Sequence, residues 1–262
     1  MSSVGCRASS RTEGGSRCAS SSTTRAGLFD YSEDRKFVAA AFRQPLHVWR
    51  PREIVAIATA HKPYFGPGRG WRYADTNYYV VGLIIEAATG RPLAAELRGR
   101  IFTPLQLRAT TFDNAARIAG RHAHGYFLQP LVDVSVGSPS VEWAAGALVS
   151  NADDLAHFFN ALLDGRLLPP QLLRTMETVR NVPFAWSYGL GLMRVPTPCG
   201  AAWGHTGASA GYNATALNSR NGKRQVVVLV NATTSLSGAG FFGLPKQAAA
   251  AVDRLVHKAL CD

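Results

Sequence analysis

Two short segments of the sequence carry side chains that could transfer protons in a catalysed reaction. The first is Tyr-Ala-Asp at 73–75, directly before a long apolar segment, and the second is His-Thr-Gly at 205–207. Burial and neighbouring charges can tune the pKa values of a phenol and an imidazole, so either group can act as a general acid or base. These segments are therefore the first candidates for a catalytic site.

The elements that must position these segments follow from hydrophobic periodicity. Apolar residues at helical spacing predict a helix from Thr76 to Thr89, ended by Gly90. The same spacing predicts further helices over 37–42, 52–61, 93–102, 154–163 and 252–260. Strand composition is found at 202–206, 211–217 and 224–230, with an Asn-Gly turn before the last. Helices followed by an antiparallel meander and a terminal packing helix predict an α+β fold.

Several further segments, taken in order, match one protein family. They read GLFDYSEDRKF at 27–37, TNYYVVGLIIEAATG at 76–90, EWAAGALVSNADDLAHFFNALLDGRLL at 142–168 and SYGLGL at 187–192. Over about residues 27–262 the chain resembles the serine D-alanyl-D-alanine carboxypeptidases and class C β-lactamases. The resemblance implies a β-lactamase/penicillin-binding-protein-like fold, with a helical region at about 30–190. An antiparallel sheet and C-terminal helix would occupy about 191–262, with the site in the cleft between the two regions.

The resemblance also implies an activity. It is acyl transfer on D-alanyl-D-alanine peptides, β-lactams or esters through an acyl-serine intermediate. The partners would be small-molecule or peptide substrates, with no cofactor and no metal ion. Members of the family act outside the cytoplasm, so a secreted, periplasmic or cell-wall location is expected. The sequence leaves the localisation and the oligomeric state open.

The matched motifs imply a role for each residue. Tyr73 corresponds to the tyrosine of a proton relay, and the alternative is a loop aromatic that only packs. His205 and Thr206 would line the sheet edge on which a substrate carboxylate docks. Gly207 would keep this edge clear for backbone pairing with the substrate. The backbone N–H of Ala208 would donate a hydrogen bond to the oxyanion.

Two further positions have open interpretations. Asp75 stands where the family has Asn. An amide donates and accepts hydrogen bonds, whereas an ionised carboxylate only accepts them, so Asp75 can donate to a substrate carbonyl only when it is protonated. Trp143 would form a wall of the substrate pocket by resemblance, and the alternative is a core aromatic.

The family's nucleophile motif, Ser-x-x-Lys, is absent from the sequence. The positions three residues before Lys36, Lys62, Lys223, Lys246 and Lys258 hold Glu33, Thr59, Arg220, Gly243 and Leu255. Arginine cannot replace the lysine, because it does not deprotonate in proteins. We therefore identify no nucleophile and expect an N-terminally incomplete serine hydrolase. The alternative is a non-catalytic relative that binds peptidoglycan fragments, or an inactive fragment.

The segment Gly207–Gly211 also matches the G-x-S-x-G nucleophile elbow of α/β-hydrolases, with Ser209 as the nucleophile. That elbow requires a helix after the serine. Here a second strand and an Asn-Gly hairpin follow, so the β-lactamase-like interpretation is favoured.

Residues 1–26 contain one Val and no Leu, Ile, Phe, Tyr or Trp, and are expected to form a disordered or aberrant leader. They show no signal peptide, and no segment of the chain is apolar enough to span a membrane. The net charge of +11 comes without a basic run or a nucleic-acid motif, so no nucleic-acid partner is expected. His122 and His124 lack a nearby third ligand for a metal ion.

The 4 cysteines form no C-x-x-C pair. Cys199 lies just before the strand with His205, and Cys261 ends the predicted terminal helix, which packs on the strands. Some carboxypeptidases of the resembled group carry a similar late pair, and a location outside the cytoplasm would allow oxidation. A Cys199–Cys261 disulfide is therefore expected, with two separate thiols as the alternative.

Overall fold

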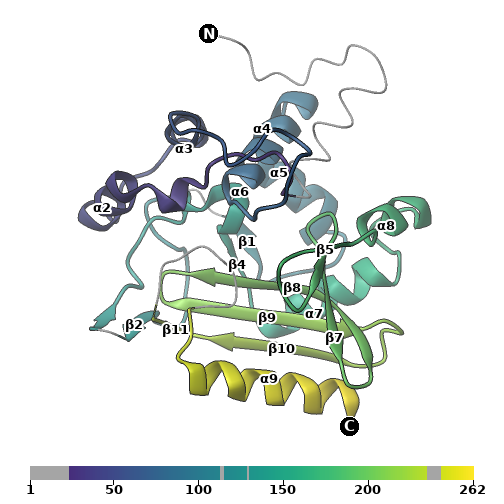
Figure 1. Cartoon of the computed structure of the whole chain (residues 1–262). Coiled ribbons are helices and arrows are strands. Elements are labelled where there is room, and N and C mark those ends of the chain that lie inside the picture. Colours follow the sequence, from purple (N-terminus) through teal and green to yellow (C-terminus); the bar gives the residue numbers. More distant parts are fainter. Residues whose placement is uncertain (1–23, 113–114, 129, 235–242) are drawn as a thin grey trace, which may run out of the picture.

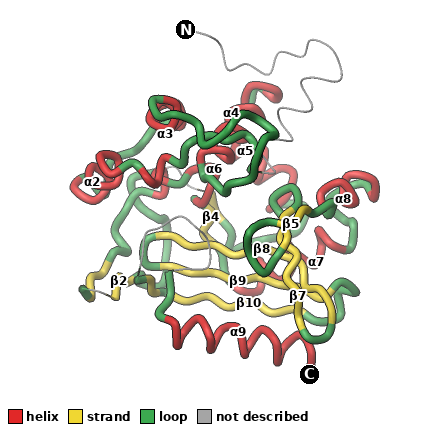
Figure 2. Tube along the Cα trace, viewed as in Figure 1, coloured by secondary structure: helices red, strands yellow, loops and turns green. Residues whose placement is uncertain are grey.

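The computed structural model describes residues 24–112, 115–128, 130–234 and 243–262. Most helices lie on one side of a main antiparallel sheet, and one long helix runs along its other side (Figure 1). Figure 2 shows the loops that connect these elements. The predicted α+β fold is confirmed.

The helical elements include both long helices and single turns. Their bounds are η1 Tyr31–Glu33, α2 Arg35–Arg43, α3 Pro51–Thr59, α4 Thr76–Thr89, α5 Leu93–Leu97, the π-helical η2 Arg98–Phe102, η3 Pro139–Val141, α6 Trp143–Gly146, α7 Ala152–Leu163, α8 Pro170–Met176 and α9 Lys246–Cys261.

The main sheet has six strands in the order β10-β9-β8-β7-β6-β5, and all its neighbouring strands are antiparallel. The strands are β5 Arg180–Asn181, β6 Ser187–Tyr188, β7 Met193–Thr197, β8 Gly200–Ser209, β9 Tyr212–Ser219 and β10 Gln225–Val230. Two small sheets pair β1 Thr111–Phe112 with β4 Leu148–Val149, and β2 Tyr126–Leu128 with both β3 Leu131–Asp133 and β11 Ala232–Thr233.

Successive side chains of a β-strand point to opposite faces of the sheet. In the main sheet, apolar side chains on both faces pack against helices. Ala202, Leu217 and Val226 pack against Val256 and Leu260 of α9. The intervening positions, which include Trp203 and Ala216, pack against Phe159 and Leu162 of α7. Helices α9 and α7 therefore lie on opposite faces of the sheet, which fixes the register of β8.

The helical region has its own core, in which α4 packs on α3 and α6. Tyr79 and Ile54 are fully buried there. A Cβ atom added to Gly82 of α4 would lie 2.7 Å from the Cβ of Ala144 and 2.8 Å from the Trp143 ring. Glycine at this position therefore allows the close approach of α4 and α6, which brings the loop before α4 to the edge of the sheet.

Several local details differ from expectation. Helix α7 begins at Ala152 rather than Asp154, because the Asn151 side chain accepts the N–H of Asp154 as the N-cap. The main sheet begins at Arg180, ahead of the boundary expected near 191. Strands β5 and β6 have two residues each, which is too short to give a periodic signal.

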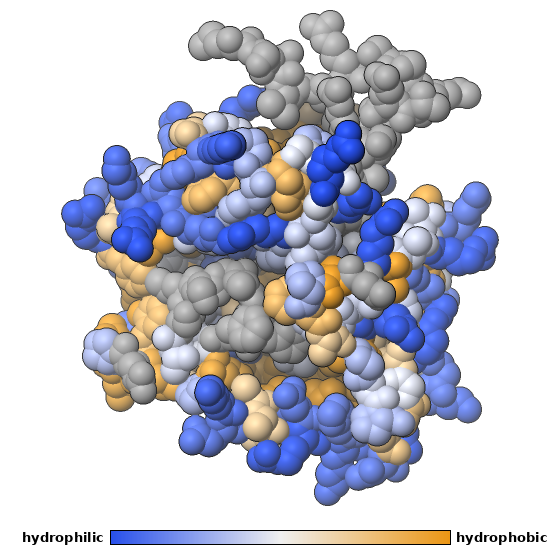
Figure 3. Space-filling view, in the orientation of Figure 1, coloured by the Kyte–Doolittle hydropathy of each residue, from blue (hydrophilic) through white to orange (hydrophobic). Residues whose placement is uncertain are grey.

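Residues 1–23 of the expected leader lie outside the described residues. From Thr24 the chain is packed: this residue is 0% exposed, and its carbonyl accepts the N–H of Arg72 at 3.1 Å. Within the described ranges, no helix is long and apolar enough to cross a membrane. Hydrophilic residues are spread over the face shown in Figure 3 and do not form a single stripe.

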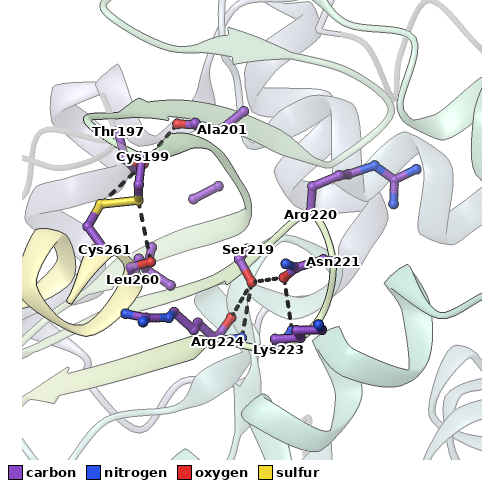
Figure 4. Close-up of a pocket in the computed structure, with 12 residues that line it drawn as sticks. Thr197, Cys199, Ala201, Ser219, Arg220, Asn221, Lys223, Arg224, Leu260 and Cys261 are labelled. Carbon is purple, nitrogen blue, oxygen red and sulfur yellow. Dashed lines mark hydrogen bonds between the residues drawn. A yellow bond between two sulfur atoms is a disulfide. The ribbon is translucent and has the colours of Figure 1, made fainter.

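The expected disulfide between Cys199 and Cys261 is confirmed, with the two Cα atoms 5.4 Å apart. It joins the start of β8 to the end of α9 (Figure 4). A pocket of about 540 Å³ lies beside it, lined in part by Arg220, Lys223 and Arg224. This pocket borders the first residues of β8, whereas the candidate site lies toward the other end of that strand.

Candidate active site

The sheet side of the candidate site is residues 205–208 of β8. Strand β7 pairs with β8 only as far as Gly204, so beyond this point β9 is the one neighbour of β8 among the described strands. Gly207 and Ala208 are exposed, and a Cβ atom at Gly207 would meet only the Ala214 Cβ, at 3.8 Å. The open edge therefore leaves space for an extended ligand to approach the backbone.

His205 is held by hydrogen bonds at both ring nitrogens. Its Nδ1 is hydrogen-bonded to the carbonyl of Thr206, and its Nε2 lies 2.9 Å from the hydroxyl of Tyr188 in β6. Burial lowers the pKa of His205, which favours the neutral imidazole. Thr206, the next residue, points to the other face of β8, where its hydroxyl lies 3.8 Å from the Met193 sulfur.

The helical side of the site is the loop 73–75, directly before α4. The backbone N–H of Asp75 donates to the carboxyl of Asp30 at 3.2 Å, which fixes the loop against the chain before η1. Burial raises the pKa of Tyr73 well above its ordinary value, and the nearby Tyr78 and Asp75 raise it further. Tyr73 therefore keeps its proton near neutral pH, as a general acid must.

Three carboxyl groups gather on this side. Burial raises the pKa of Asp75 well above its ordinary value, and the charges of Asp30 and Glu142 raise it further. Burial likewise raises the pKa of Asp30, and that of Glu142 to about 6. Within the described ranges none of the three takes part in an ion pair, so no cation offsets the burial that favours their protonation.

Aromatic and hydroxyl contacts join the two sides. The ring of Tyr73 lies 6.1 Å from that of Tyr188, and the hydroxyls of Tyr78 and Tyr188 are hydrogen-bonded although these residues are 110 positions apart. The structure thus brings Tyr73, Asp75 and His205 together around Tyr188. Sequence reasoning missed Tyr78 and Tyr188; the segment SYGLGL was noticed only as part of the resemblance.

Trp143 does not line this part of the structure. It is 4% exposed and packs on Tyr79 with ring centroids 5.4 Å apart, inside the helical core. The proposed site therefore does not include Trp143, which was expected to form a wall of the substrate pocket. The preceding residue, Glu142, is the one that reaches the sheet.

Ser209 at the end of β8 contacts the helical region directly. Its hydroxyl donates to Glu142 Oε1 at 2.5 Å. Strand β9 follows at Tyr212, so the serine does not lie in the strand-to-helix turn of an α/β-hydrolase elbow. The pair was not foreseen from the sequence, because Glu142 and Ser209 are 67 positions apart.

An aromatic cluster borders Tyr188. Trp71 lies 6.1 Å from Tyr188, and Phe184 stacks on Trp186 with ring centroids 4.9 Å apart. A cavity of about 400 Å³ adjoins Trp71 and is lined by Arg25, Gly68, Arg69, Gly70, Trp71 and Arg180. Phe184 in this cluster is exposed, so the cluster presents an apolar surface next to Tyr188.

The described residues hold no group of three or more potential metal ligands. Of the two histidines considered at 122 and 124, His124 has its Nδ1 2.7 Å from an Asp133 carboxyl oxygen. This is a two-residue surface contact.

The fold is that of the β-lactamase family. The sequence pattern of the Beta-lactamase family matches residues 22–241. The chain belongs to this family.

Two solved structures and a curated relative are similar to the chain. A D-stereospecific amidohydrolase from Streptomyces sp. has a TM-score of 0.81 and 32% identity, covering 93% of this chain and 72% of that one. The D-amino acid amidase from Ochrobactrum anthropi SV3, complexed with D-phenylalanine, has a TM-score of 0.78 and 25% identity, covering 91% and 70%. A D-aminopeptidase of Cereibacter sphaeroides is 28% identical over 200 residues, which is 72% of this chain and 37% of that protein.

The chain spans only part of such relatives. Its matches cover 40% and 37% of the length of the first two curated relatives.

Proposed function

We propose that loop 73–75 and the open edge of β8 border a substrate cleft, which binds amides or peptides in which a D-amino acid supplies the reacting carbonyl. The reaction that this binding supports is acyl transfer through an acyl-serine intermediate. The observation that supports this proposal most directly is that Tyr188 contacts both Tyr73 and His205. One substrate can therefore contact the helical side and the sheet side together.

Each side of the cleft has a distinct role in this proposal. Tyr73, which is protonated near neutral pH, supplies a proton to the departing amine. The neutral His205 and the hydroxyl of Thr206 flank the edge on which the substrate carboxylate docks, and Gly207 leaves this edge open. The N–H of Ala208 donates to the oxyanion. Asp75, when protonated, can donate to the substrate carbonyl.

The names of the relatives support a D-amino acid substrate. They are a D-aminopeptidase, a D-stereospecific amidohydrolase and a D-amino acid amidase, so the proposal places amides of D-amino acids ahead of β-lactams, esters and D-alanyl-D-alanine. The cluster of Trp71, Phe184 and Trp186 offers an apolar side chain a complementary surface. A site outside the cytoplasm remains the proposed location.

The proposed binding site contains no identified nucleophile. The sequence contains no Ser-x-x-Lys, so the residues named here supply substrate binding and proton transfer but not the attacking serine. A second candidate function follows from this absence, namely a relative that binds D-amino acid derivatives without turning them over.

Isothermal titration calorimetry with D- and L-phenylalaninamide tests the binding proposal. We expect the D-enantiomer to bind about tenfold more tightly, because the similar proteins are named for D-amino acid substrates. Tyr73→Phe should weaken binding of the D-enantiomer, whereas Tyr212→Phe should not, because the Tyr212 hydroxyl donates to the carbonyl of Ala123 outside the site. Equal binding of the two enantiomers would overturn the proposal.

Intact-mass spectrometry after incubation with a fluorescent penicillin tests whether this chain carries a nucleophile of its own. We expect no covalent adduct, because no Ser-x-x-Lys is present to attack. An adduct on Ser209 would instead assign the nucleophile to the Ser209–Glu142 pair.

A further inference from the structure

The cavity of about 400 Å³ beside Trp71 has three arginines in its wall. Its lining residues are Arg25, Gly68, Arg69, Gly70, Trp71 and Arg180. None of them is acidic. The volume lies within the range of small-ligand pockets, which is about 300–1,000 Å³. We call this space the arginine cavity.

The positive charge of the arginine cavity has no carboxylate partner in the protein. Within the described ranges none of its three arginines takes part in an ion pair. The guanidinium of Arg25 donates to the carbonyl of Gly68, which holds the side chain in place but does not neutralise it. The nearby Arg72 differs, because Glu33 accepts its hydrogen bond at 2.7 Å.

A further donor in the wall of the cavity is also unpaired. The indole N–H of Trp71 has no acceptor among the described residues. Guanidinium groups bind carboxylates and other oxyanions through paired, charge-assisted hydrogen bonds. An excess of donors and positive charge without any acidic side chain therefore makes an oxyanion the complementary ligand.

Two lining residues connect the arginine cavity to the candidate site. Arg180 in β5 is paired with Tyr188 in β6, and directly opposed residues of neighbouring strands project to the same face of the sheet. Trp71 lies 6.1 Å from the Tyr188 ring and two positions before Tyr73. Tyr188 in turn lies 2.9 Å from His205. Two extended residues span roughly 7 Å, so a ligand bound at the candidate site can place a second group in the cavity.

We propose that the arginine cavity is an anionic subsite of the candidate site, and that the substrate carries a carboxylate within about two residues of its reacting carbonyl. This inference rests on the proposed function and narrows its substrate class to amides or peptides of an acidic D-amino acid, such as D-glutamate. Arg69 and Arg180, whose side chains are exposed, bind the carboxylate. Trp71 packs against the methylene groups that lead to it.

The subsite adds to the aromatic cluster and does not replace it. An apolar D-amino acid amide such as D-phenylalaninamide can contact Trp71, Phe184 and Trp186, but it leaves the arginines without a partner. A ligand with a carboxylate uses both the apolar surface and the positive charge. The structure therefore predicts a charge preference that is independent of the preference for one enantiomer.

Isothermal titration calorimetry with the α-amide of D-glutamic acid and with D-glutaminamide tests the inference. The two ligands differ only in a side-chain carboxylate against a carboxamide of similar size. We expect the acid to bind the wild-type protein about tenfold more tightly, because charge-assisted hydrogen bonds are stronger than neutral ones. The double variant Arg69→Gln/Arg180→Gln should bind the two ligands equally. Arg254→Gln, which removes an exposed charge on α9 outside the cavity, should keep the preference.

Equal binding of the two ligands to the wild-type protein, or a preference that persists in the double variant, would overturn the inference. Titration with D- and L-phenylalaninamide keeps this result separate from the proposed function, because neither of these ligands carries a carboxylate. If the two enantiomers are distinguished but the two glutamate derivatives are not, the subsite alone is wrong.

Titration with inorganic phosphate separates a substrate carboxylate from a free anion. If phosphate binds the wild-type protein and not the double variant, while the glutamate derivatives bind equally, the cavity holds a free anion. That result would also overturn the inference.

Discussion

The two sides of the candidate site are built in different ways. On the sheet side, residues 205–208 are positioned by the regular register of β8 with β9, and the disulfide holds the start of the same strand. On the helical side, loop 73–75 depends on buried polar groups. Asn77, which is 1% exposed, has an amide with no hydrogen-bond partner among the described residues. The sheet side is therefore held by strand pairing and a disulfide. The helical side contains a network of polar groups whose hydrogen bonds depend on protonation.

The largest expected effect tests how closely β8 is packed. A Cβ atom at Gly204 would lie 1.9 Å from the backbone oxygen of Ala216, whereas at Gly207 it would have ordinary contact at 3.8 Å. Gly204→Ala should lower the free energy of unfolding by about 3–5 kcal/mol. Gly207→Ala should lower it by less than about 1 kcal/mol. Urea unfolding measures both, and equal losses would contradict the account of the open edge.

The next prediction compares the stability of the two sides after the disulfide is removed. Cys199→Ser combined with Cys261→Ser should reduce the stability by about 2–4 kcal/mol, because the bond closes a loop with a sequence separation of 62. Hydrogen exchange should accelerate first in β8 and α9, and later in α4. Faster exchange in α4 than in β8 would show that the sheet is not a separate template.

A smaller effect tests the polar network through pH. The pKa of Glu142 is raised from 4.5 to about 6, so the folded state binds this proton more tightly than the unfolded state does. Its contribution is fully present below about pH 4.5 and is lost as the pH rises through about 6, at a cost of roughly 2 kcal/mol. Glu142→Gln should thus be more stable than wild type above pH 6, and equal to it near pH 4.

Thermal unfolding at pH 4, 6 and 8 measures this difference. Asp153→Asn, which changes an exposed carboxyl on α7, is the matched control and should follow the wild-type pH dependence. A Glu142→Gln variant that is less stable at pH 8 would mean that the charge of Glu142 has a compensating partner.

The sequence predicted the sheet side better than the helical side, for physical reasons. Strand composition and the Asn-Gly turn located β9 and β10, and the positions of Cys199 and Cys261 predicted their bond correctly. Tyr78 lies within the apolar periodicity of α4, so nothing in the pattern distinguished it from a core residue. Its partner Tyr188 belongs to a two-residue strand, and their contact depends on tertiary packing that local spacing does not encode.

The same reasoning applies to the carboxyl groups. Asp75 was a candidate because it precedes a helix in a family motif, whereas Asp30 and Glu142 lie in matched segments for which the resemblance implied no site residue. Burial raises the pKa values of all three carboxyl groups, and the charges of Asp30 and Glu142 raise that of Asp75 further. Such coupling becomes visible only when the chain is folded.

The most direct test of the central claim follows backbone amide signals of the whole chain during titration with D-phenylalaninamide. If the two sides form one site, the amides of Tyr73 and Asp75 should shift together with those of Gly207 and Ala208, with a single dissociation constant. Shifts confined to one side, or two different dissociation constants, would contradict the claim.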